Sequence, residues 1–198
     1  MFVAGDKGFF VQYKFILPET IKHSHYTYQK LFRAIYGYTQ KVCKSNGKSY
    51  SYHRKGLLSD TPFIKHGKNC VIIPQDAFPE LKNFFQTGKN PTHQWRTKGD
   101  WKAVYYLNEK DLTEEQITKA VEDYIDRYYV PTGGAHEKLE LELATFLSQQ
   151  KNAPADPGRK RLLLSEAQRL VSHPWFKQAH KTPKIASFYE SYNKLREP

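Results

Sequence analysis

The chain has few cysteines and no long apolar run, and these two absences narrow its class. Only Cys43 and Cys70 occur among the 198 residues, so a disulfide framework and a zinc site built from Cys pairs are both excluded. No stretch approaches the roughly 18 apolar residues of a membrane span, and residues 1–6 show no basic segment leading into an apolar run. We therefore expect no membrane association and an intracellular location, in the cytoplasm, nucleoid or nucleus.

The motifs that mark common metal and cofactor sites are also missing. The sequence contains no HExxH, no finger-like spacing of Cys and His, and no GxGxxG or GxxxxGK[ST] loop. No nucleophile-elbow motif supports Ser-His-Asp catalysis. The expectation is a protein that holds no metal ion and no cofactor.

What the chain has in excess is positive charge and aromatic rings. Lys and Arg number 31 against 20 Asp and Glu, a net charge of +11, and aromatic residues make up 15% of the chain. A surplus of this size favours a polyanionic partner, nucleic acid first and an acidic membrane surface second. A solubility charge without any partner is the plain alternative.

This charge is unevenly distributed. The net charge is +7 over residues 1–60, +4 over 61–110, −6 over 111–150 and +6 over 151–198. Such asymmetry is easier to explain by one binding surface and one non-binding face than by a uniform solubility charge.

Hydrophobic periodicity predicts an α+β fold, with an antiparallel sheet built from hairpins, helices packed on one side of it and a helical C-terminal extension. A strand is expected at 8–17 and a helix at 25–37, which Ser24 is placed to cap. Hairpins are expected at 38–54 around Ser45-Asn46-Gly47, at 63–74 around Gly67-Lys68, and at 93–107 around Lys98-Gly99-Asp100. Further helices are expected at 76–87, 113–129 and 135–149, and from Ser165 to Pro174; Thr113 and Ser165 each open a capping-box pattern.

These elements group into four expected parts. They are a basic, aromatic-rich α+β domain at 1–130, an acidic helix at 131–150, a linker at 151–160 and a basic helical tail at 161–198. The linker is predicted because two prolines and a glycine fall between Ala153 and Gly158.

The first hairpin is the predicted nucleic-acid-binding element. It carries Lys41, Lys44, Lys48, Arg54 and Lys55, with Tyr50 and Tyr52 between them. Lys and Arg neutralise phosphates, Tyr stacks on unpaired bases or packs against sugars, and a two-stranded ribbon fits a major groove. If the two tyrosines instead face the core, the same cations form an ordinary solvated surface.

Two further segments are candidates for the same role. The third hairpin combines rings with basic side chains: His93, Trp95, Arg96, Lys98, Trp101 and Lys102. Exposed Trp beside Arg is a stacking platform, whereas buried Trp would only anchor the sheet. The run Arg159-Lys160-Arg161 is a possible phosphate clamp on a flexible arm, and a localisation signal or a solvated helix end would look the same.

Two other functions stay open. A metal-independent endoribonuclease needs a base, an acid and a cationic stabiliser, and His53, Tyr52 and Lys55 are the weak candidates for these roles. A protein-interaction module would instead dock a partner through the acidic helices 113–129 and 135–149. A non-enzymatic binder of DNA or RNA is the preferred hypothesis.

Overall fold

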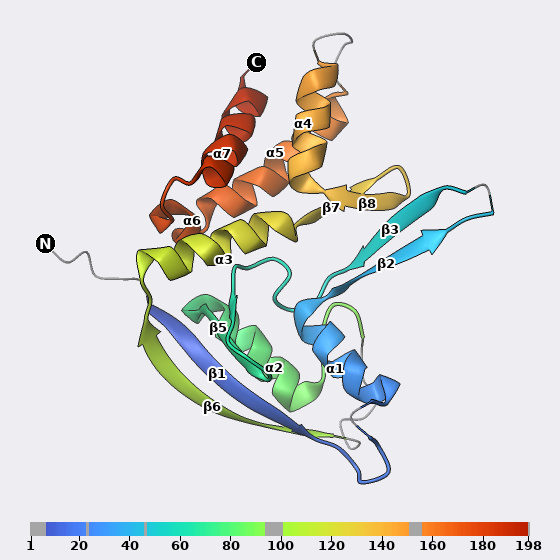
Figure 1. Cartoon of the computed structure of the whole chain (residues 1–198), viewed down its shortest axis with the longest axis vertical. Helices are drawn as coiled ribbons and strands as arrows, with labels where there is room; N and C mark the ends of the chain where they lie inside the picture. The colour runs from blue at the N-terminus through green and yellow to red at the C-terminus, as the bar shows by residue number, and fades with distance from the viewer. Residues whose placement is uncertain (1–6, 23, 46, 94–100, 151–155, 198) are drawn as a thin grey trace, which may run out of the picture. The chain divides into compact units, whose positions relative to one another are not determined.

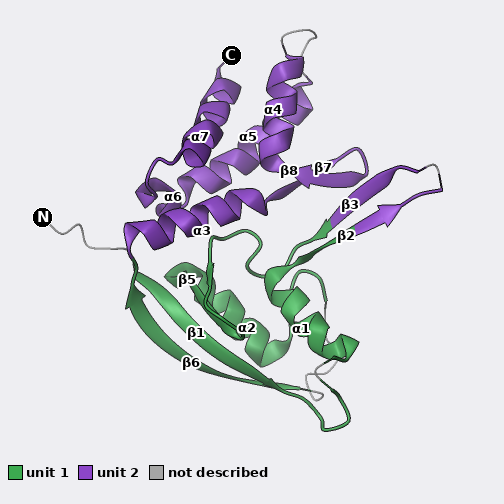
Figure 2. Cartoon of the chain, in the orientation of Figure 1, with its two compact units in different colours: residues 1–40, 53–112 green, residues 41–52, 113–198 purple. Residues whose placement is uncertain are grey.

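The computed structural model describes residues 7–22, 24–45, 47–93, 101–150 and 156–197. It confirms the α+β class, with antiparallel sheets and a C-terminal helical region (Figure 1). The chain divides into two compact units, one of residues 1–40 and 53–112 and the other of residues 41–52 and 113–198 (Figure 2).

Unit 1 is built on a four-stranded antiparallel sheet with the order β4-β5-β1-β6. Its strands are β1 (Lys7–Ile16), β4 (Ile64–Lys65), β5 (Cys70–Pro74) and β6 (Lys102–Asp111). From Val11 to Ile16, buried and exposed residues alternate along β1, as expected for a strand with one face in the core. The predicted strand at 8–17 and the predicted hairpin around Gly67-Lys68 are confirmed.

Two helices, α1 (Tyr26–Tyr36) and α2 (Phe78–Thr87), cover one face of this sheet. The ring centroids of Tyr13 and Phe85 lie 5.5 Å apart and those of Phe15 and Phe84 6.4 Å apart, so α2 packs on the side to which these residues of β1 point. The buried Leu31 and Ile35 of α1 join the same core. The order β1-α1-β4-β5-α2-β6 is that of a split βαβ unit.

A hairpin of β2 (Tyr38–Cys43) and β3 (Ser49–Arg54) is inserted between α1 and β4 as a separate two-stranded sheet. It confirms the first predicted hairpin. A close approach of Gly37 and Gly56 brings the chain together where the hairpin begins and ends, because a Cβ on Gly56 would lie 2.2 Å from the Gly37 nitrogen. The division between the units runs through this hairpin, whose residues 41–52 count with unit 2.

Unit 2 is otherwise helical, with one short hairpin. Its elements are α3 (Glu114–Asp126), β7 (Tyr129–Thr132), β8 (Ala135–Lys138), α4 (Leu139–Gln149), α5 (Pro157–Ser172), α6 (Pro174–Gln178) and α7 (Pro183–Arg196). The apolar stripe predicted on α3, which includes Ile117, Val121 and Ile125, is buried, and Thr113 forms the predicted capping box with Gln116. The helix at 113–129 is therefore confirmed to within a few residues.

Several local predictions are wrong. Ser165 opens no helix, because α5 already begins at Pro157, where the Asp156 side chain accepts a bond from Gly158 N. The last four residues of the expected linker are thus helical, while residues 151–155 lie outside the described residues. Residues 135–138 form β8 rather than the start of a helix, and the cap of α1 is His25, not Ser24.

Candidate functional site

The β2–β3 hairpin is held by contacts between its two strands. Near the turn, Lys44 N donates to Lys48 O and Gly47 N donates to Lys44 O, both at 2.9 Å. Near its base, Thr39 Oγ1 and His53 Nδ1 lie 3.1 Å apart. These contacts place Thr39 opposite His53, so the side chains of Tyr50 and Tyr52 point to the other face of the ribbon.

Both hairpin tyrosines are half-buried rather than sealed in the core. The Lys44 ammonium lies 4.5 Å from the centroid of the Tyr50 ring, which is a cation–π contact. A cation and an accessible ring therefore occur together on the outer part of the hairpin.

The cations of the hairpin project into solvent. Lys41, Lys44, Lys48 and Arg54 are exposed. No Asp or Glu occurs between Glu19 and Asp60, whereas the same stretch holds Lys22, Lys30, Arg33, Lys41, Lys44, Lys48, Arg54 and Lys55. The hairpin therefore has no carboxylate of its own to neutralise it.

Arg33, at the base of the hairpin, was missed in the sequence, whereas His93 was expected only as a member of the third hairpin. Arg33 of α1 lies 4.8 Å from the Tyr38 ring centroid and 5.7 Å from that of Tyr26. His93 has a lowered pKa because of partial burial, with smaller contributions from the charges of Lys30 and Arg33. The five-residue spacing of Arg33 and Tyr38 carries no recognisable motif, and His93 is remote in sequence.

Of the expected hairpin cations, Lys55 is engaged within unit 1. Its ammonium binds both carboxylate oxygens of Asp60, at 2.8 and 3.1 Å, and its backbone carbonyl accepts from the Thr92 hydroxyl. This ion pair reduces the charge that Lys55 can offer to a ligand.

The structure describes only part of the third predicted hairpin. Trp95, Arg96 and Lys98 lie outside the described residues. Trp101 is 1% exposed and packs edge-on against Phe15 at 5.5 Å, so it anchors the core and is no stacking platform. Lys102 is exposed at the start of β6, which pairs along its whole length with β1.

The Arg159-Lys160-Arg161 run lies in the first two turns of α5 and not on a flexible arm. Arg159 pairs with Glu142 and donates to the Pro131 carbonyl at 2.7 Å, and its side chain is only 21% exposed. Lys160 donates to the Glu197 carbonyl at 2.6 Å. Only Arg161 keeps an exposed side chain, with a long contact of 3.4 Å to the Pro157 carbonyl.

The acidic helices of unit 2 meet cations and polar groups of the same unit. Lys184 binds Asp126 at 2.6 Å, and the Thr182 hydroxyl donates to Glu122 at 2.7 Å. Residues 113–198 contain 13 Lys and Arg against 12 Asp and Glu, so this segment is almost neutral. Residues 1–112 contain 18 against 8 and hold nearly all of the surplus positive charge.

The three catalytic candidates, Tyr52, His53 and Lys55, do not converge on one site. Tyr52 and His53 are consecutive in β3 and so point to opposite faces of the hairpin, and Lys55 is paired with Asp60. No observation therefore favours the ribonuclease alternative over the binding hypothesis.

No protein-family model, curated protein or solved structure matches this chain. The function is therefore inferred from the charges, rings and backbone of the chain itself. Within the described ranges, no helix has the length and apolar character needed to cross a bilayer. In the same ranges, no three His, Cys, Asp or Glu side chains lie close enough together to hold a metal ion.

Unit 2 also contains a cavity that the sequence did not indicate. Its volume is about 710 Å³, and it lies among α5, α6 and α7. The apolar side chains of Val171, Phe176 and Ile185 contribute to its lining, together with Lys177 and Lys181 of the expected basic tail. Oppositely charged Glu190 lines the same space, so the cavity is not uniformly basic.

Proposed function

We propose that this protein binds nucleic acid and that the β2–β3 hairpin is its main contact. The observation that carries the proposal is an exposed two-stranded ribbon with Lys41, Lys44, Lys48 and Arg54 in a segment without any carboxylate. Lys and Arg in this setting neutralise backbone phosphates and release counterions, which gives affinity for either DNA or RNA.

The rings of the hairpin add a second kind of contact. Tyr50 is half-buried beneath the Lys44 ammonium, so this lysine can move to a phosphate while the ring packs against a sugar or base. Arg33, stacked on Tyr38, supplies a further planar cation at the hairpin base. The proposal assigns no such role to Arg159 or Lys160, because both are bound to groups of unit 2.

The test compares two variants that lose the same charge from different places. Lys41→Gln/Lys44→Gln removes two hairpin lysines, and Lys82→Gln/Lys119→Gln removes two exposed lysines of α2 and α3. Fluorescence anisotropy with labelled single- and double-stranded probes, in the presence of a chelator, gives the affinity of each. We expect the hairpin variant to bind about tenfold more weakly or worse and the control to bind like the wild type.

Equal weakening by the two variants would show that only overall charge matters, and the hairpin assignment would then be wrong. Absence of binding by the wild type to every probe would reject nucleic acid as the partner. The probes are recovered intact if the protein is a binder, whereas shortened probes would indicate the nuclease activity that the proposal does not include.

A further inference from the structure

Over β1 and β6, the face of the four-stranded sheet opposite α1 and α2 is accessible to solvent. Pairing of β1 with β6 sets Phe10 opposite Asn108, Gln12 opposite Tyr106, Lys14 opposite Val104 and Ile16 opposite Lys102. These residues alternate with the helix-facing Val11, Tyr13 and Phe15 and so share the other side of the sheet. We call this surface the open face: Phe10, Gln12, Lys14 and Ile16 of β1 with Lys102, Val104, Tyr106, Asn108 and Lys110 of β6.

Large apolar groups of the open face are in contact with solvent. Tyr106 is 60% exposed, Val104 51% and Ile16 48%. Phe10, on the neighbouring strand, is half-buried, with the His66 ring edge-on at 5.8 Å and the Lys110 ammonium 5.3 Å from its centroid. Because Tyr106 is diagonal to Phe10 across the strand pair, two rings lie within reach of one ligand.

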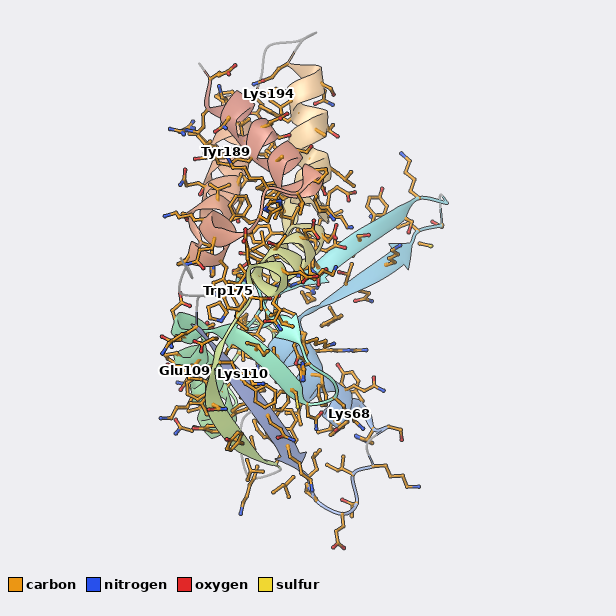
Figure 3. All side chains as sticks on the ribbon, turned by 60° about the vertical axis from the view of Figure 1, so that its left-hand side comes forward. Lys68, Glu109, Lys110, Trp175, Tyr189 and Lys194 are labelled. Carbon is orange, nitrogen blue, oxygen red and sulfur yellow. The ribbon has the colours of Figure 1, made fainter. Side chains whose placement is uncertain are left out.

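The open face is basic as well as aromatic. Its positions on β1 and β6 include Lys14, Lys102 and Lys110 and no carboxylate, because Glu109 and Asp111 alternate to the other side of β6. Figure 3 labels Glu109 and Lys110, which are neighbours on this strand. Glu109 is bound there by Lys7 at 2.5 Å and by Gln75 at 2.9 Å. Exposed amides of Gln12 and Asn108 provide hydrogen-bond donors and acceptors between the rings and the lysines.

We infer that the open face is a second binding surface, and that it takes the unpaired bases of a single-stranded nucleic acid. The inference rests on the proposed function and names its ligand class. Tyr106 and Phe10 stack on bases, Gln12 and Asn108 read base edges, and Lys14, Lys102 and Lys110 hold the phosphates that follow the strand.

Single strands fit this surface better than a duplex does. The π-faces of paired bases are hidden within the stack, so rings on a broad sheet can reach only unpaired bases, and sheets with helices on one side and aromatic rings on the other are a known platform for them. A protein partner fits less well, because three lysines without a carboxylate are unfavourable at the core of a protein–protein interface.

Tyr106 provides the direct test, with three substitutions. Tyr106→Leu keeps an apolar side chain but removes the ring, Tyr106→Phe keeps the ring, and Tyr189→Leu removes a tyrosine of α7 that is 43% exposed. Affinities are measured for oligo(dT), oligo(U) and a duplex of matched length. We expect Tyr106→Leu to weaken single-strand binding roughly 5- to 150-fold, with the duplex affinity unchanged and the other two variants close to wild type.

A second measurement uses the wild-type protein, so it does not depend on how a variant folds. Oligonucleotides that carry 5-iodouracil are photocrosslinked, and the modified peptide is located by mass spectrometry. Crosslinks within residues 7–16 or 102–111 are expected. Comparison of the affinities for oligo(dT) and oligo(U) shows whether the protein prefers a deoxyribose or a ribose backbone.

The possible failures are distinguishable. If Lys41→Gln/Lys44→Gln weakens binding while Tyr106→Leu leaves single-strand affinity unchanged, the hairpin proposal stands and the open face is not a binding surface. A change in oligomeric state without a change in affinity would likewise overturn the inference and indicate a protein contact. If the wild type binds none of the probes, both proposals fall.

Discussion

At the scale of single residues, the same side chain has different roles according to what it meets in three dimensions. Arg54 and Arg159 both lie next to other cations in the sequence. Arg54 is exposed on the hairpin, whereas Arg159 joins α5 to Glu142 and to the Pro131 carbonyl. A run of basic residues therefore could not reveal which member is structural, because the partners of Arg159 lie 17 and 28 residues away.

Arg159→Ala is expected to lower the free energy of unfolding and to leave nucleic-acid affinity unchanged. Removal of the guanidinium leaves the largely buried Glu142 carboxylate without this partner, at a cost of about 1–3 kcal/mol. Urea unfolding measures the effect, and Arg161→Ala, on the exposed side of the same turn, is the control, expected within about 0.5 kcal/mol of wild type. Unchanged stability with lost affinity would restore the phosphate-clamp interpretation.

His93 gives a prediction for pH. Because its pKa is lowered in the folded protein, the unfolded chain binds the proton more readily, and the stabilising contribution of neutral His93 is lost as the pH falls below its ordinary value of 6.5. Between pH 7.5 and pH 5, wild type should therefore lose more unfolding free energy than His93→Gln. Urea titrations at the two pH values measure this difference, and an equal or larger loss in the variant would contradict it.

At the scale of secondary-structure elements, the sequence predicted well wherever the signal was local. The hairpin at 38–54, the helix 113–129 and the strand 8–17 follow from alternation, capping and turn residues. The helix start predicted at Ser165 was wrong because a capping-box pattern also occurs inside helices. Asp156 followed by Pro157 is an earlier signal for the start of the same helix. The strands β7 and β8 were missed because four residues each are too few to show a period of two.

The two capping-box patterns should respond differently to alanine. Thr113→Ala removes a cap that accepts from Gln116 N, and a loss of about 0.5–2 kcal/mol in unfolding free energy is expected. Ser165→Ala should be neutral or stabilising by up to about 0.5 kcal/mol, because Ala has the higher helix propensity in the middle of α5. Equal losses in thermal or urea unfolding would contradict the helix boundaries given above.

Two glycines with nearly the same positive φ should differ in their tolerance of a side chain. Gly37 has φ +72° and a Cβ there would lie 2.7 Å from the Arg54 carbonyl, whereas Gly47 has φ +75° and nothing within 4 Å. Gly47→Ala should cost about 1–2 kcal/mol from left-handed strain alone. Gly37→Ala should cost roughly 1–3 kcal/mol more because of the clash, and equal urea midpoints would argue against the close approach at the hairpin base.

At the scale of the whole molecule, the position of the positive charge could be predicted only in part from the sequence. The linear charge profile shows a surplus of positive charge in the first 110 residues. It could not show that the acidic stretch and the basic tail would fold into one unit and pair, as Asp126 does with Lys184 and Glu142 with Arg159. The open face could not be predicted from the sequence either. Its residues come together only through the pairing of β1 with β6, which are about 95 residues apart in the chain.

The most direct measurement of the central claim is the dependence of nucleic-acid affinity on salt, for wild type and for Lys41→Gln/Lys44→Gln. If these lysines neutralise phosphates, the logarithm of the association constant should fall linearly with the logarithm of salt concentration, and the slope of the variant should be shallower by about 0.7–0.9 for each lysine removed. A wild-type affinity that is insensitive to salt, or the same slope for both proteins, would contradict the claim that the hairpin binds the phosphate backbone.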